Sequence, residues 1–255
     1  MMRYSVLTNR IVVFFLMFTT SVAMAASNSI DGIWIGEYSS GSSTDLTKEI
    51  IIFKTVSSEE GSKVVGAYLT ADGFAGTLEG AYQDESNLVF ILRQPMFHCP
   101  QAATGVLKVE LKDEKIEYFY FGKSCTGEGT SQGTGSKIST IPQNKGLLGF
   151  WQGSDSTTFF FDFIEKTDPI PAQQLMGIYV NDNGNSGILT GTSLPSIEQK
   201  FTLTNTKPSP TCSAKGVLTG EFRKDTTALS YSFVSTDCSG KSSTETGQAT
   251  SLSTK

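Results

Sequence analysis

Apolar and polar residues alternate with a period of two along most of the chain, and no window shows a clear helical period. This pattern predicts short β-strands and little helix. In the first half we expect strands at residues 31–38, 48–55, 63–70, 74–82, 87–93, 104–112, 115–121 and 131–138. In the second half we expect strands at residues 149–155, 158–165, 174–181, 186–193, 199–204, 215–223, 227–235 and 245–252.

The turns between these segments favour hairpins. Asp72-Gly73 and Asn183-Gly184 each separate two alternating runs, and such pairs are typical of two-residue turns in which both central residues have positive φ. Strands that follow one another through hairpins form an up-and-down meander. We therefore predict an all-β fold of two tandem eight-stranded antiparallel meander barrels, with open β-sandwiches as the alternative.

The two halves are copies of one domain. Gly32-Ile33-Trp34-Ile35-Gly36 corresponds to Gly149-Phe150-Trp151-Gln152-Gly153, and residues 76–80 correspond to 187–191 at an offset of 111. Residues 139–146 between the copies carry proline, glycine and polar residues without periodicity. We predict a first barrel at residues 26–140, a linker at 141–148 and a second barrel at 149–255.

The N-terminus has the pattern of a secretory signal. Arg3 and Arg10 precede an apolar run at residues 11–18, and Ala23-Met24-Ala25 provides a small-residue cleavage site. We predict that residues 1–25 are a signal peptide and that the mature protein is periplasmic or secreted. An uncleaved N-terminal anchor is the alternative, and we expect no membrane span in the mature chain.

The four cysteines follow the repeat. Cys99 and Cys125 are 26 residues apart, and Cys212 and Cys238 have the same spacing. In an exported chain, paired cysteines are the expected state. We predict one disulfide in each copy, Cys99–Cys125 and Cys212–Cys238, each contributing roughly 3 kcal/mol through loop entropy.

The charge balance argues against nucleic acid as a partner. The full chain has 20 basic and 25 acidic residues, and loss of Arg3 and Arg10 with the signal leaves 18 basic residues and a formal charge of −7. Proteins that bind nucleic acid usually present a basic surface. We therefore expect a small apolar molecule or another protein as the partner.

The Gly-x-Trp motif on the first of eight sequential strands in each copy resembles the calycin architecture of lipocalins and avidins. The resemblance implies that Trp34 and Trp151 close one end of each barrel and that the adjoining glycine lets the strand bend. A second resemblance is to small exported barrel inhibitors of bacterial metalloproteases, which also combine a Gly-x-Trp start with one disulfide.

The sequence offers no recognisable catalytic apparatus. His98 is the only histidine, so neither a histidine metal site nor a duplicated Ser-His-Asp arrangement is available. We expect no enzyme activity, no metal and no cofactor. The aromatic residues repeated on the strands are the candidate ligand-binding residues, although filling the core is the alternative role for them: Trp34, Tyr68, Tyr118, Tyr120, Trp151, Tyr179, Tyr231 and Phe233.

These observations favour an exported, non-catalytic binding protein that takes a small apolar ligand or a protein partner through lipocalin-like barrels. A second hypothesis is a secreted protein–protein interaction factor, such as a protease inhibitor or a virulence accessory, that uses loops on sealed domains. An enzyme without a recognisable motif is the third.

Overall fold

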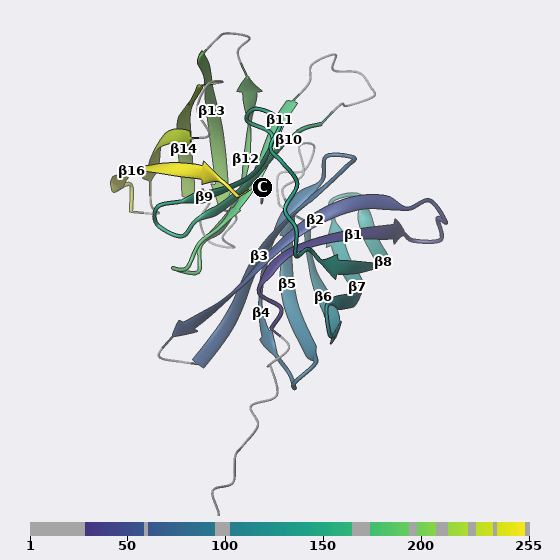
Figure 1. The fold of residues 1–255 in the computed structure, drawn as a ribbon. Helices are drawn as coiled ribbons and strands as arrows, with labels where there is room; N and C mark the ends of the chain where they lie inside the picture. The colour runs from purple at the N-terminus through teal and green to yellow at the C-terminus, as the bar shows by residue number, and fades with distance from the viewer. Residues whose placement is uncertain are drawn as a thin grey trace, which may run out of the picture.

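The computed structural model describes residues 29–58, 61–94, 103–164, 174–193, 198–207, 214–223, 228–236 and 239–252. Within these residues the regular structure is entirely β (Figure 1). The expected signal segment 1–25 and His98 lie outside the described residues. Among the described residues no helix is long and apolar enough to cross a membrane.

The first copy is a closed barrel in which each strand pairs with the next and β8 pairs with β1. All of its pairings are antiparallel, so the strands form a meander. Its strands are β1 (Gly32–Ser40), β2 (Thr47–Ser58), β3 (Gly61–Thr70), β4 (Ala75–Tyr82), β5 (Asn87–Gln94), β6 (Ala103–Lys112), β7 (Lys115–Ser124) and β8 (Gly127–Lys137).

The second copy repeats this order, and β9 closes the barrel by pairing with both β10 and β16. Closure in both copies rules out the open-sandwich alternative. Its strands are β9 (Gly149–Gly153), β10 (Thr158–Ile164), β11 (Gln174–Val180), β12 (Ser186–Ser193), β13 (Glu198–Lys207), β14 (Ala214–Arg223), β15 (Ala228–Thr236) and β16 (Ser242–Ser251).

The predicted all-β meander is confirmed, but β8 and β16 begin about four and three residues earlier than the alternation indicated, at Gly127 and Ser242. These starts are rich in glycine, serine and threonine and lack apolar alternation. In β8 the small residues have a packing reason. A Cβ atom added at Gly133 would lie 2.2 Å from the hydroxyl of Tyr118 on β7, so a larger residue would displace that ring.

The predicted hairpins form, but the predicted turn type is wrong. Gly73 and Gly184 have φ of 85° and 76°, whereas Asp72 and Asn183 do not have positive φ. The amide of Thr70 donates to the carbonyl of Phe74, so three residues separate the paired positions in the first of these turns. Only the glycine then needs the left-handed conformation, since Asp72 is not at the first central position of a two-residue turn.

A buried tryptophan lies near one end of each barrel, where the first strand of that copy begins. Trp34 is fully buried and its indole N–H donates to the carbonyl of Ile30 at 2.7 Å, while Trp151 donates to the carbonyl of Leu147 at 2.8 Å. Each tryptophan therefore satisfies its only polar atom with a carbonyl four residues before it. The opposite end of the first barrel lies where β1, β3, β5 and β7 finish.

Cys125 lies in the turn between β7 and β8, at that opposite end, and it is disulfide-bonded. Cys99, Cys212 and Cys238 lie outside the described residues. The pairing of cysteines within each copy therefore stays a prediction.

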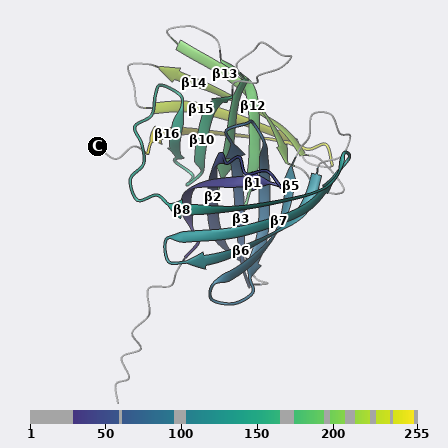
Figure 2. The ribbon, with the colours of Figure 1, turned by 90° about the vertical axis from the view of Figure 1, so that its right-hand side faces the viewer.

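The two barrels pack through the same wall of each copy, with β3 against β11 and β4 against β12. Figure 1 and Figure 2 show the second barrel seated on the side of the first that contains β2 and β3. Because β3 and β11 are corresponding strands, as are β4 and β12, the contact resembles the isologous interface of a symmetric dimer.

This interface has its own apolar core. Outward-facing side chains of the first barrel pack with those of the second in one buried cluster that includes Val65, Ala67, Leu69, Met176, Ile178 and Val180. Lys54 forms an ion pair with Asp182 across the edge, and this contact lowers the pKa of the Asp182 carboxyl. Ile138 and Ile141, between the barrels in sequence, pack on the same cluster.

The interface predicts that a charge on β3 will separate the barrels without unfolding them. In Ala67→Asp, a fully buried apolar position would receive a carboxylate, at a cost of several kcal/mol. We expect a larger maximum dimension in small-angle X-ray scattering with an unchanged far-ultraviolet circular dichroism spectrum. Val106→Asp, at an exposed position on β6, is the control and should leave both unchanged. An unaltered scattering curve for Ala67→Asp would contradict the interface.

Candidate functional site

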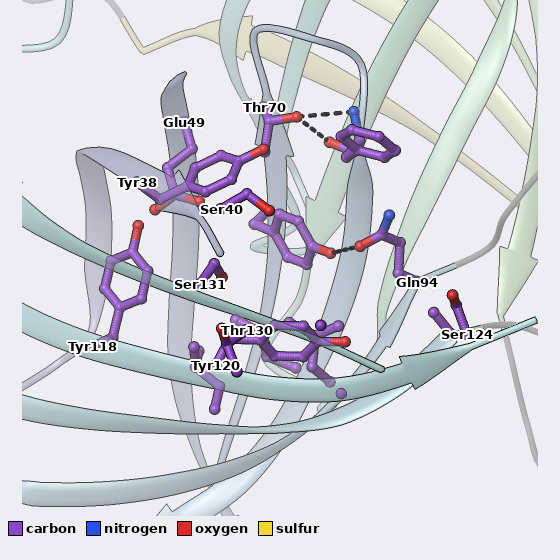
Figure 3. Close-up of a pocket in the computed structure, with 18 of the residues that line it drawn as sticks. Tyr38, Ser40, Glu49, Thr70, Gln94, Tyr118, Tyr120, Ser124, Thr130 and Ser131 are labelled. Carbon is purple, nitrogen blue, oxygen red and sulfur yellow. Dashed lines mark hydrogen bonds between the residues drawn. The ribbon is translucent and has the colours of Figure 1, made fainter. Parts of the chain in front are cut away.

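A cavity of about 270 Å³ lies inside the first barrel, at the end opposite Trp34. Its deeper wall is apolar and consists of Ile51, Leu78, Leu92 and Leu107. Its other lining side chains come from the ends of the strands and include four tyrosines, Tyr38, Tyr68, Tyr118 and Tyr120 (Figure 3). Small-molecule sites in proteins are typically apolar concavities of about 300–1,000 Å³ with a few polar groups, so this cavity is at the small end of that range.

Hydrogen bonds hold two of the tyrosines in place. The hydroxyl of Tyr68 on β3 donates to Oε1 of Gln94 on β5 at 2.7 Å. The hydroxyl of Tyr38 lies 3.3 Å from Oδ2 of Asp72, a residue of the β3–β4 turn whose other oxygen accepts from Thr70. Burial raises the pKa of Tyr68 and of Tyr38, and Asp72 raises the pKa of Tyr38 further, so both remain neutral donors.

Among the described residues that line this cavity, Glu49 carries the one buried carboxyl group. Glu49 is only 7% exposed, and its Oε1 has no hydrogen-bond partner within the described part of the chain. Burial, with the nearby Asp72 carboxylate, raises the pKa of Glu49 from 4.5 to about 8. Gly36 on β1 makes room for it, since a Cβ atom there would lie 3.1 Å from Oε1.

The hydroxyl of Tyr118 is the second buried polar atom without a partner in the described structure. Its position is set by Gly133, the cross-strand neighbour of Tyr118 on β8. Figure 3 shows Tyr118 and Glu49 at the same end of the cavity as Tyr38. A buried donor or acceptor without a partner costs about 1–3 kcal/mol, so two in one cavity need an explanation beyond folding.

In the second copy, the tyrosine that corresponds to Tyr118 has a hydrogen-bond partner. Tyr231 pairs with Gly247 as Tyr118 pairs with Gly133, and the hydroxyl of Tyr231 donates to Oδ1 of Asp155 at 3.1 Å. Asp155 stands four residues after Trp151, where the first copy has Tyr38 four residues after Trp34. The tyrosine that both copies share is thus hydrogen-bonded to an aspartate in the second copy, whereas its hydroxyl has no partner in the described part of the first.

Two substitutions between the copies change the size and the charge of the lining. Ile51 pairs with Trp34 across β1 and β2, and Phe159 pairs with Trp151 in the same register. Gly36 pairs with Glu49, whereas the amide of Gly153 donates to Thr157. The second copy therefore has a larger apolar side chain in place of Ile51 and a short neutral one in place of Glu49.

The aromatic rings of the second barrel pack on one another around Phe159. Its ring centroid lies 5.3 Å from that of Tyr231, in an edge-to-face arrangement, and 6.0 Å from that of Phe161, to which it is nearly parallel. Tyr179 lies 6.3 Å from both Phe159 and Phe233. These contacts are typical of a filled core.

The structure separates the eight candidate ligand-binding residues into three groups. Tyr68, Tyr118 and Tyr120 line the cavity. Trp34 lies in the apolar core of the first barrel and does not line the cavity, and the remaining four, Trp151, Tyr179, Tyr231 and Phe233, lie in or against the core of the second.

Sequence reasoning missed Tyr38, Glu49 and Gln94. One signal was available. Trp34 and the core residue Phe53 are 19 residues apart, whereas the corresponding Trp151 and Phe161 are only 10 apart. The first copy therefore has a longer β1–β2 hairpin, and both Tyr38 and Glu49 lie on that hairpin.

The chain matches no protein-family model and no curated protein. Within the described residues, no group of three or more His, Cys, Asp and Glu side chains is placed to hold a metal ion.

The raised pKa of Glu49 predicts a pH-dependent stability. Between about pH 4.5 and pH 8 the folded protein keeps a proton that the unfolded chain has released, so the free energy of unfolding falls as pH rises. The slope is at most about 1.4 kcal/mol per pH unit for one group. Urea unfolding at pH 5, 6.5 and 8 should show wild type losing stability relative to Glu49→Gln. Parallel pH profiles for the two proteins would contradict a raised pKa.

The unpaired Tyr118 hydroxyl predicts a contrast between the copies. Tyr118→Phe removes a buried hydroxyl that has no partner in the described structure, so unfolding in urea should show no loss of stability. Tyr231→Phe removes the donor to Asp155 and should cost about 1 kcal/mol. Equal losses in the two variants would mean that Tyr118 has a partner in the folded protein.

Proposed function

We propose that this chain is an exported, non-catalytic binding protein whose first barrel takes a small, largely apolar molecule. The observation that carries the proposal is the cavity of about 270 Å³ inside the first barrel, with apolar walls and a few polar groups at one end. Eight-stranded barrels have an interior of the size that side chains can fill or that one small ligand can occupy.

The calycin-like architecture supports this reading. In lipocalins and avidin-type proteins, as in this fold, a meander barrel is closed at one end and can hold a ligand toward the other. Here Trp34 closes one end, and the cavity lies toward the other, where Tyr38, Tyr68 and Gln94 stand. The second barrel then supports the first through the shared interface, and its own aromatic residues fill its core.

A second candidate function rests on the outer face of the first barrel. Ile91, Val106 and Phe121 are cross-strand neighbours on β5, β6 and β7 and are 45%, 36% and 48% exposed, with Phe119 adjacent on β7. Val217 and Val234 are paired and exposed at the corresponding positions of the second barrel. Exposed apolar rows of this kind favour a protein partner.

Cavity binding can be tested with the neutral fluorescent probe N-phenyl-1-naphthylamine. Ile51→Phe introduces the side chain that the second copy has at this position, so it should fill the cavity and weaken probe binding at least tenfold. Ile35→Phe places the same change at an exposed position on β1 and should leave the affinity unchanged. Circular dichroism would verify that both variants are folded.

The same probe can show binding at the exposed outer row in place of the cavity. If Ile51→Phe binds the probe as wild type does, and Phe119→Ser with Phe121→Ser abolishes binding, the probe binds the outer row instead of the cavity. That outcome would overturn the small-molecule function and favour the protein-partner function.

A further inference from the structure

We propose that the ligand of the first barrel is a small organic cation, with an ammonium or similar nitrogen donor held between Glu49 and Tyr118 and an apolar body against the deeper wall. This inference rests on the proposed function and adds the chemical class of the ligand. It follows from what the cavity leaves unpaired, from the charge around it and from the comparison with the second copy.

The unpaired atoms define what the ligand must supply. Oε1 of Glu49 and the hydroxyl of Tyr118 are buried and lack partners in the described structure, and both belong to side chains that line the cavity. The carboxyl group of Glu49 must ionise to pair with a cation, and once ionised it only accepts hydrogen bonds. A tyrosine hydroxyl can accept one as well. A ligand nitrogen with several hydrogens can therefore satisfy both atoms, and a positive charge on it would strengthen the contact with Glu49.

The charge distribution favours a cation over an anion. The groups that face Glu49 or share its cavity are Tyr38 on β1, Tyr68 on β3, Asp72 in the β3–β4 turn, and Tyr118, Tyr120 and Lys123 on β7. Asp72 is a second carboxyl group acting on Glu49, while Lys123 is exposed. An anionic ligand would lie beside two carboxyl groups.

The rest of the lining fits the remainder of such a molecule. Four tyrosines line the space. The face of an aromatic ring attracts a cation within about 6 Å of its centroid. Ile51, Leu78, Leu92 and Leu107 offer only apolar contact below them. The ligand class is therefore an amine with an aromatic or aliphatic body of a size that a cavity of about 270 Å³ can hold.

The second copy shows that the fold does not need this carboxyl group. Thr157 replaces Glu49 in the same register, and Asp155 partners the tyrosine hydroxyl that stays unpaired in the first copy. A buried carboxyl group is costly, and the barrel closes around a tryptophan plug without it. Glu49 therefore has a role that is specific to the first cavity.

Cation binding would also release a proton. In the empty protein the pKa of Glu49 is raised to about 8, so its carboxyl group is protonated at pH 7. Pairing with an ammonium group requires the carboxylate, and the proton passes to solvent. The affinity for a cation should therefore rise with pH toward about 8 and then level off, by up to about tenfold per unit below that value.

Three isosteric probes test the inference: 2-phenylethylamine, 2-phenylethanol and phenylacetate. By isothermal titration calorimetry at pH 7.5, wild type should bind the amine at least tenfold more tightly than the alcohol or the acid. Glu49→Gln should lose at least tenfold in amine affinity and little in alcohol affinity. Tyr118→Phe should weaken the amine severalfold without loss of stability, and Tyr231→Phe should leave binding unchanged.

Proton release separates ligand contact from a structural role. Titrations of the amine in phosphate and in HEPES, which differ in ionisation enthalpy, should give release of close to one proton per amine bound at pH 7, given a pKa of about 8. Glu49→Gln should release none. A structural role for Glu49 would alter stability but would not produce this difference.

The failures of the two proposals are distinguishable. If the alcohol or the acid binds as tightly as the amine, or if Glu49→Gln leaves the amine affinity unchanged, the cation inference is wrong and cavity binding stands. If none of the three binds while the naphthylamine probe still responds to Ile51→Phe, the cation inference is likewise wrong. If that probe is insensitive to Ile51→Phe, the proposed function itself fails.

Discussion

Closure of an eight-stranded sheet into a barrel sets a fixed interior volume, and the rest of this structure depends on how each copy fills it. An interior of this size is just wide enough for the inward side chains of its own strands. Each copy closes one end with a tryptophan whose N–H is satisfied by a nearby carbonyl. The side chains at the other end then decide whether the barrel is filled or open.

The two copies solve this problem differently with nearly the same framework. In the second copy a short hairpin brings Asp155 to Tyr231, and Phe159 occupies the centre of an aromatic cluster. In the first copy a longer hairpin carries Tyr38 and Glu49, and Ile51 is smaller than Phe159. The longer hairpin and the absence of a ring at Ile51 together leave the cavity. Two buried polar atoms in it are unpaired in the described structure.

Duplication also explains how the barrels associate. The walls that contain β3 and β11 are apolar on both faces, as the runs Val64–Leu69 and Leu175–Val180 show, because one face fills the barrel and the other meets the second copy. Near-continuous apolar runs are typical of strands that are buried on both sides. These apolar runs are visible in the sequence, but strand alternation alone does not indicate that both faces are buried.

The sequence by itself determined the all-β class, the sixteen strands and the repeat, because side-chain alternation and turn residues act over a few neighbouring positions. It also identified Tyr68, Tyr118 and Tyr120 as candidates, since their alternation places them on the inner face. Only the tertiary structure decided that Glu49, Gln94 and Tyr38 share a cavity. Their proximity depends on barrel closure and strand register, which relate residues far apart in the chain, and on the ring volume that the first copy lacks.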